Sequence, residues 1–154
     1  MPRPAITALR FVIALSLVGS VLVQTVLMTA IWFDLEAVPL GLRITVIAIF
    51  EAWVICLQVV AVCIWRLAGL AASGAVFTTV AFRSVDIVIG AIGVAGVLTA
   101  ALATLMVGGA AAPGLVGLVY GAALVTGGVA LVVVVMRMLL RQAADMRAEL
   151  AEVV

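Results

Sequence analysis

The chain has 154 residues, of which 68% are hydrophobic and 10% are charged, and its mean hydropathy is +1.50. A water-soluble domain of this size does not need so much apolar surface, so the composition predicts an integral membrane protein, with the lipid bilayer as its first partner. The formal net charge of +1 excludes the basic excess of a protein that binds nucleic acid directly. The sequence has neither His nor Lys and shows no pair of nucleophile and base and no cluster of metal ligands. We therefore predict no catalytic residue, no metal and no cofactor.

Four apolar segments are long enough to cross about 30 Å of hydrocarbon as helices, which takes roughly 20 residues each. They run from about 11 to 33, 44 to 65, 87 to 107 and 115 to 136. Backbone groups in lipid cannot bond to water, so these segments must be helical, and short connections make neighbouring helices antiparallel. The sequence predicts a single all-α transmembrane domain over residues 1–154. Its architecture is an up-down four-helix bundle whose last helix continues as a tail over residues 137–154.

The arginines predict the orientation of the domain. Arg43 lies beside Asp34 and Glu36, next to the connection between the first two spans, whereas the other arginines flank the opposite ends of the spans: Arg3, Arg10, Arg66, Arg83, Arg137, Arg141 and Arg147. Each basic residue near an anionic leaflet contributes about 1 kcal/mol. The positive-inside rule therefore predicts that both termini are cytoplasmic.

The second span contains the polar residues Glu51 and Gln58 within the apolar stretch "VIAIFEAWVICLQVV", residues 46–60. They are seven residues apart and so share one face of a helix. Gln24 in the first span lies at a similar depth, which makes it the first expected partner of Glu51. An ionised side chain at mid-membrane costs about 2.5 to 3.5 kcal/mol, so the carboxyl group is expected to be hydrogen-bonded, protonated or both. Two interpretations stay open: a structural hydrogen bond between the first two spans, and a protonatable site for a proton or cation.

Small residues predict where the last two spans pack. Gly117 and Gly121 in "GLVYG" form a small-xxx-small pattern that allows two helix backbones to approach closely. The partner is either the third span or a second copy of the chain in a homo-oligomer. Arg83 and Asp86 are three residues apart where the third span begins, and this spacing predicts an interfacial ion pair that sets the depth of the helix, with a ligand site as the alternative.

The segment after the fourth span, "RMLLRQAADMRAELAEVV", has helix-forming residues and no helix breaker. Apolar residues repeat at spacings of four and three, which is the pattern of a coiled-coil seam; they are Leu139, Ala143, Met146, Leu150 and Val153. This seam is the candidate binding surface for a partner. It is expected to pack against a helix of another protein or of a second copy, against the chain's own inner connection (residues 66–86), or against the membrane surface.

The stretches "VFTTVAFRSVDIVIGAIGV" and "VMRMLLRQAADMRAELAEVV", with the glycine-bearing span between them, resemble a family of small bacterial four-span membrane proteins, domain of unknown function 2975. The resemblance is clearest over residues 75–154. It implies a location in the bacterial inner membrane. It also implies a cytoplasmic partner, because members of the family are often encoded beside a small helix-turn-helix regulator.

Our leading hypothesis from the sequence is a non-enzymatic inner-membrane protein. Its tail helix and inner connection would bind a cytoplasmic regulator or another membrane subunit. The alternative is a small oligomeric transporter or channel, with Gln24, Glu51 and Gln58 along the route.

Overall fold

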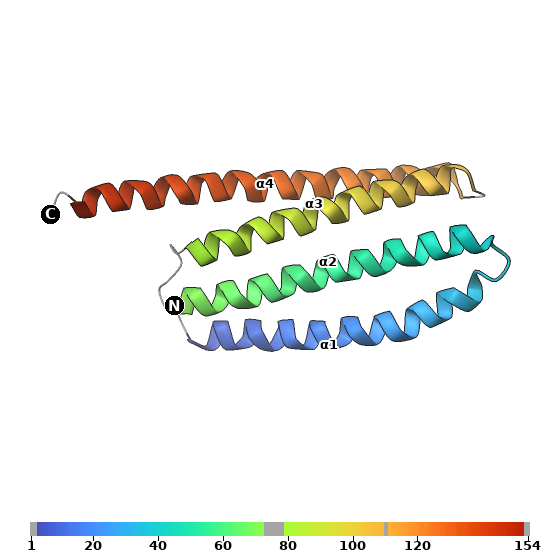
Figure 1. The fold of residues 1–154 in the computed structure, drawn as a ribbon, viewed down its shortest axis with the longest axis horizontal. Coiled ribbons are helices and arrows are strands. Elements are labelled where there is room, and N and C mark those ends of the chain that lie inside the picture. The colour runs from blue at the N-terminus through green and yellow to red at the C-terminus, as the bar shows by residue number, and fades with distance from the viewer. Residues whose placement is uncertain (1–2, 73–78, 110, 153–154) are drawn as a thin grey trace.

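Four antiparallel α-helices make up the fold in the computed structural model, which describes residues 3–72, 79–109 and 111–152 and the side chains of 6–72, 81–109 and 111–146. The helices are α1 (Arg3–Asp34), α2 (Leu40–Ala72), α3 (Thr79–Val107) and α4 (Pro113–Glu152), and Figure 1 shows their up-down order. No strand occurs within the described residues. All four helices are long and apolar enough to cross a membrane. The predicted all-α fold with four membrane-spanning helices is confirmed.

The helices extend beyond the apolar segments that predicted them. α2 continues seven residues past position 65, and α3 begins eight residues before position 87. Hydropathy marks only the part of a helix that lies in hydrocarbon, whereas Ala, Leu and Arg continue the helix through the interface. α4 has 40 residues without a break and is therefore about 60 Å long. It includes the described part of the predicted tail.

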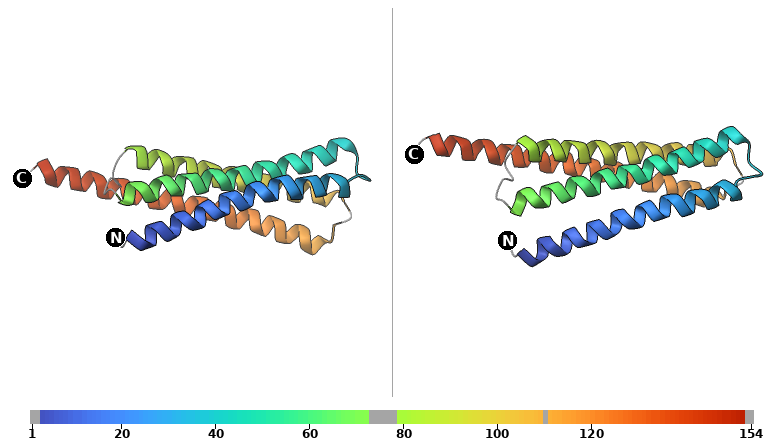
Figure 2. Two further views of the ribbon diagram at one scale, coloured as in Figure 1. Left: turned by 90° about the horizontal axis from the view of Figure 1, so that it is seen from below. Right: turned by 60° about the horizontal axis from the view of Figure 1, so that its bottom comes forward.

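The helices are arranged in series. Close backbone contacts join α1 to α2, α2 to α3 and α3 to α4, and across the three described ranges none joins α1 to α3 or α4, or α2 to α4. Figure 1 shows this order, with α1 and α4 at the two edges. Figure 2 shows that the helices do not lie in one plane, because α4 crosses the others at an angle. The bundle is therefore open between its first and last helices.

Large apolar side chains point outward on all four helices wherever side chains are described. Phe11 is 71% exposed, Leu118 70% and Leu124 78%. Such a surface would make a protein aggregate in water, but hydrocarbon is as apolar as leucine and solvates it. The residues buried between helices are mostly small, among them Ala81, Ala95 and Ala103. The interfaces between helices therefore depend on close backbone approach and on a few polar contacts.

The fold has two ends of different charge. The connection between α1 and α2 carries Glu36 and is flanked by Asp34 and Arg43; we call this the acidic end. At the other end α1 begins, α2 ends, α3 begins and the last part of α4 continues outward (Figure 1). We call it the arginine-rich end, because five arginines with described side chains belong to it: Arg10, Arg66, Arg83, Arg137 and Arg141.

Candidate functional site

Four polar side chains from α1 and α2 form a chain of hydrogen bonds within the membrane-spanning region. Gln24 donates from Nε2 to Oε2 of Glu51 at 2.9 Å. Gln58 donates from Nε2 to Oε1 of Gln24 at 2.8 Å and to Oγ of Ser20 at 3.0 Å. The Ser20 hydroxyl in turn donates to the carbonyl oxygen of Leu17 at 2.8 Å. Ser20, Gln24, Glu51 and Gln58, which we call the polar cluster, are all partly buried between the two helices.

Helix geometry explains why these four residues meet. Ser20 and Gln24 are four residues apart and Glu51 and Gln58 are seven apart, so each pair lies on one face of its helix. Gln24 lies ten residues before the end of α1 and Glu51 lies eleven after the start of α2, which places both about 15 to 17 Å below the connection. The expected contact between Gln24 and Glu51 is present, and Gln58 joins it. Ser20 was not among the predicted site residues, although its spacing of four from Gln24 was the available signal.

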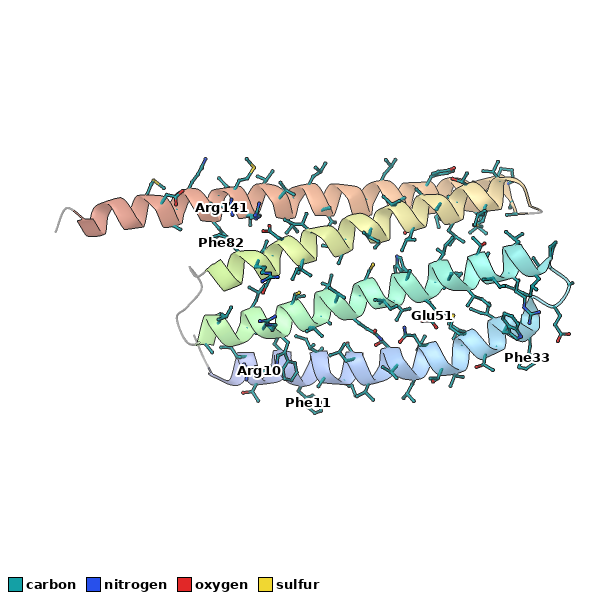
Figure 3. All side chains as sticks on the ribbon, viewed as in Figure 1. Arg10, Phe11, Phe33, Glu51, Phe82 and Arg141 are labelled. Carbon is teal, nitrogen blue, oxygen red and sulfur yellow. The ribbon has the colours of Figure 1, made fainter. Side chains whose placement is uncertain are left out.

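The polar cluster can act as a clamp between α1 and α2. Gln58 donates two hydrogen bonds through its single amide nitrogen, while the carboxyl group of Glu51 accepts one from a neutral amide. Figure 3 shows Glu51 on the side of α2 that faces α1, at one edge of the serial array. A cavity of about 330 Å³ lies beside the cluster and is lined in part by Ser20 and Gln58. The cluster therefore joins two helices and does not lie in a space enclosed by all four.

An arginine packs on a tryptophan at each end of the same interface. At the acidic end, the Arg43 guanidinium lies 3.7 Å from the centre of the Trp32 ring and also donates to the Trp32 carbonyl oxygen. That carbonyl belongs to the last turn of α1, where backbone oxygens lack helical partners and a positive charge is favourable. At the arginine-rich end, the Arg10 guanidinium lies 5.7 Å from the centre of the Trp65 ring. The sequence analysis did not predict these two cation-π contacts.

Asp86 pairs across the α3–α4 interface. Arg137 of α4 donates from Nη2 to Oδ2 of Asp86 at 2.6 Å, and its Nε forms an ion pair with Oδ1. The predicted pair of Arg83 with Asp86 is therefore corrected, because the structure places the carboxylate on a cation of the neighbouring helix, and the side chain of Arg83 is exposed. The antiparallel helices bring Arg137 to the depth of Asp86, where a charge-assisted hydrogen bond to the neighbouring helix forms.

The close approach of α3 and α4 occurs at Gly96. A Cβ atom at this position would lie 3.6 Å from Cγ2 of Thr126 and 3.7 Å from the carbonyl oxygen of Ala123. At Gly117 and Gly121 such an atom would meet nothing within 4 Å. Of the two partners expected for these glycines, the third span is therefore wrong, and packing against a second copy stays a prediction. They lie roughly 120 to 160° around α4 from Ala123, the residue that faces α3.

The seam of the tail helix faces away from α3. The side of α4 that does face α3 is marked by Arg141, whose guanidinium lies 5.6 Å from the centre of the Phe82 ring. On the other side Leu139 is 54% exposed, Met146 is 59% exposed, and Ala143 is exposed as well. Of the other two predicted seam residues, the structure describes only the backbone of Leu150, and Val153 lies outside the described residues.

The tail helix also continues beyond the start of α3. Arg141 lies level with Phe82, and α3 begins three residues before Phe82, at Thr79. Because the two helices are antiparallel, α4 extends past α3 from about residue 145, as Figure 1 shows. The last two turns of α4 therefore have no neighbouring helix among the described residues.

Four long, antiparallel and outwardly apolar helices with polar contacts inside their interfaces define a small multi-pass membrane protein. Residues 4–154 match the family described as "Protein of unknown function (DUF2975)", and the chain belongs to this family. The resemblance found in the sequence is thereby confirmed. No curated protein and no solved structure matches the chain.

Proposed function

We propose that this protein is a non-enzymatic anchor in the bacterial inner membrane that holds a cytoplasmic regulator at the membrane. The seam of the tail helix carries the proposal, because Leu139 and Met146 are 54% and 59% exposed on the side of α4 that faces away from α3. Beyond the hydrocarbon, apolar side chains on one face of a helix favour a partner. The occupant we propose is a helix of a small helix-turn-helix regulator, which the spacing of four and three fits.

The geometry of α4 favours a partner over the membrane surface. The helix is unbroken from Pro113 to Glu152, so its tail continues in the direction of the membrane-spanning part. An amphipathic tail that lay on the membrane would need a bend where it leaves the bilayer, and kinks of this kind have causes such as Pro or Gly pairs. Figure 1 shows no such bend, and the segment from Arg137 to Glu152 contains neither Pro nor Gly.

The inner connection supports the same proposal, since Arg66 and Arg83 flank it at the arginine-rich end and both side chains are exposed. Within this connection, residues 73–78 lie outside the described residues. These two exposed positive charges belong to the same end of the molecule as the tail helix.

Two neighbouring alanines supply a matched test. A photo-crosslinking amino acid at Ala143 lies on the seam, whereas the same residue at Ala144 lies about 100° around the helix. In native membranes we expect position 143 to crosslink a helix-turn-helix regulator at least tenfold more than position 144. A tenfold difference corresponds to about 1.4 kcal/mol. Met146→Glu should abolish the product, because a charge would then be buried in the interface.

Other products at position 143 would contradict the proposal. A second copy of the chain, a lipid, or equal yields at the two positions would each show that the seam does not hold the regulator. Mass spectrometry of the crosslinked product distinguishes these occupants.

The polar cluster favours a second candidate, a small oligomeric transporter or channel in which Glu51 is the protonatable site. The cluster lies between α1 and α2 at the edge of the array, so a route along it would need a second copy of the chain packed against that edge. Proton or cation flux in proteoliposomes tests this candidate. Absence of flux, or flux that Glu51→Gln leaves unchanged, would contradict it.

A further inference from the structure

An apolar cavity of about 370 Å³ lies at the arginine-rich end and receives side chains from all four helices. Its lining includes Leu9 of α1, Ala68 and Ala71 of α2, Ala81 and Phe82 of α3, and Leu140 of α4. All of the side chains that line it are apolar. Alanines on α2 and α3 leave this volume open where the two helices meet. The volume is within the range of ligand sites, which is roughly 300 to 1,000 Å³.

Two guanidinium groups, one from α1 and one from α4, lie next to parts of the helices that line this cavity. Arg10 follows the lining residue Leu9, and its Nη2 lies 2.9 Å from the position that a Cβ atom on Gly69 would take. In the sequence, Gly69 lies between Ala68 and Leu70, which both line the cavity. Arg141 follows Leu140, and its guanidinium lies 5.6 Å from the centre of the Phe82 ring, another part of the lining. Figure 3 shows Arg10 and Arg141 at the same end of the molecule.

The charges around the cavity are mostly positive. Arg66 and Arg83 are exposed and adjoin the lining residues Leu67 and Phe82 in the sequence. Two acidic side chains are described at this end. Asp86 is bound by Arg137, and the exposed Asp145 lies one turn beyond Arg141. The rim therefore combines several cations with an apolar interior.

We propose that this cavity binds an anionic phospholipid, with the headgroup among the arginines around the cavity and an acyl chain inside it. A small water-soluble anion would gain nothing from the apolar lining, and a purely apolar segment of protein would gain nothing from the two guanidinium groups. An anionic lipid satisfies both, because guanidinium groups bind phosphate oxygens through paired hydrogen bonds. Basic sites between helices near a membrane surface bind lipid headgroups in this way.

Native mass spectrometry of the full chain in detergent tests the headgroup. The probes are phosphatidylglycerol and phosphatidylcholine with identical acyl chains. We expect phosphatidylglycerol to bind at least tenfold better. Arg10→Gln and Arg141→Gln should each weaken phosphatidylglycerol about fivefold, the effect of one basic residue near a membrane surface, and should leave phosphatidylcholine unchanged. Arg43→Gln removes the same charge at the acidic end and is the control; measured under conditions where it stays folded, it should change the binding of neither lipid.

A second pair of variants tests the cavity. Ala71→Phe places a ring in the proposed acyl site and should weaken both lipids. Ala122→Phe is the control, because Ala122 lines a different apolar cavity, between α2, α3 and α4. If Ala71→Phe does not fold, the arginine variants decide the question.

Several outcomes would overturn the proposal. If the two lipids bind equally well, the arginines do not bind the headgroup. If Arg43→Gln weakens phosphatidylglycerol as much as Arg10→Gln and Arg141→Gln do, the loss reflects net charge and not this site. The same spectra report the number of chains in each complex. A dimer that Ala71→Phe dissociates while lipid binding is unchanged would assign the cavity to a second copy.

Discussion

The hydrogen bonds of the polar cluster predict how much each of its residues stabilises the α1–α2 interface. Gln24 takes part in two of them, donating to Glu51 at 2.9 Å and accepting from Gln58 at 2.8 Å, whereas Glu51 takes part in one. Hydrogen bonds between membrane helices contribute about 0.6 kcal/mol on average and at most about 1.7 kcal/mol. We therefore expect Gln24→Leu to lower the free energy of unfolding by about 1.2 to 3.4 kcal/mol, and Glu51→Leu by about 0.6 to 1.7 kcal/mol.

A double-mutant cycle in detergent, with unfolding induced by sodium dodecyl sulfate, measures these contributions. The coupling between Gln24 and Glu51 should be about 0.6 to 1.7 kcal/mol. The pair of Glu51 and Asp86 is the control, because Asp86 bonds to Arg137 and shares no printed partner with Glu51, and its coupling should stay below about 0.5 kcal/mol.

Glu51→Gln separates the two interpretations of the carboxyl group. The amide keeps an oxygen that can accept from Gln24, so this variant should stay within about 0.5 kcal/mol of the unmodified chain. The reasoning is refuted if Glu51→Gln destabilises as much as Glu51→Leu, or if the coupling between Gln24 and Glu51 is indistinguishable from zero.

Three further predictions use the same unfolding assay. Gly96→Leu should lower the free energy of unfolding by about 1 to 3 kcal/mol, because atoms beyond Cβ would push α3 away from α4. Gly117→Leu is the control and should leave it nearly unchanged. Equal losses in the two variants would contradict the contact assigned to Gly96. Arg43→Lys should lower the free energy of unfolding by about 0.5 to 2 kcal/mol, because lysine lacks the flat guanidinium that packs on the Trp32 ring. An unchanged unfolding midpoint would contradict this packing. Asp86→Asn removes an ion pair whose aspartate is 44% exposed, so it should cost less than about 1 kcal/mol, and Arg83→Gln should cost nothing; a larger loss for Arg83→Gln would restore the pairing expected from the sequence.

The sequence predicted the features that depend on depth along a helix. Long apolar segments predict the helices, because hydrocarbon allows few alternatives to a helix. Counting residues from the connection placed Gln24 and Glu51 at one level, because the rise per residue is fixed. Helix-forming residues without a breaker predicted that the fourth helix continues into the tail.

Apart from the contact between Gln24 and Glu51, the sequence did not predict which side of each helix faces its neighbour. In a water-soluble protein, an apolar stripe marks the buried face of a helix. In lipid the exposed and buried faces are both apolar, so the hydrophobic pattern does not show which face is buried. For this reason the spacing of Gly117 and Gly121 predicted a close contact with the third span, whereas the structure places Gly96 of α3 against α4. Pairing across helices also depends on rotation about the helix axis. Asp86 therefore lies on Arg137 of α4 and not on Arg83 of its own helix.

The serial order of the helices has a consequence for synthesis at the ribosome. Among the described residues, every close contact between helices joins a helix to the next one along the chain. Each interface can thus form as soon as its second helix has entered the bilayer, without waiting for the C-terminus, and short-range pairing of this kind is fast. In such an assembly, a substitution that separates α1 from α2 should leave α3 and α4 paired. Repeat proteins behave in this way, because their stability is a sum of interactions between neighbouring repeats.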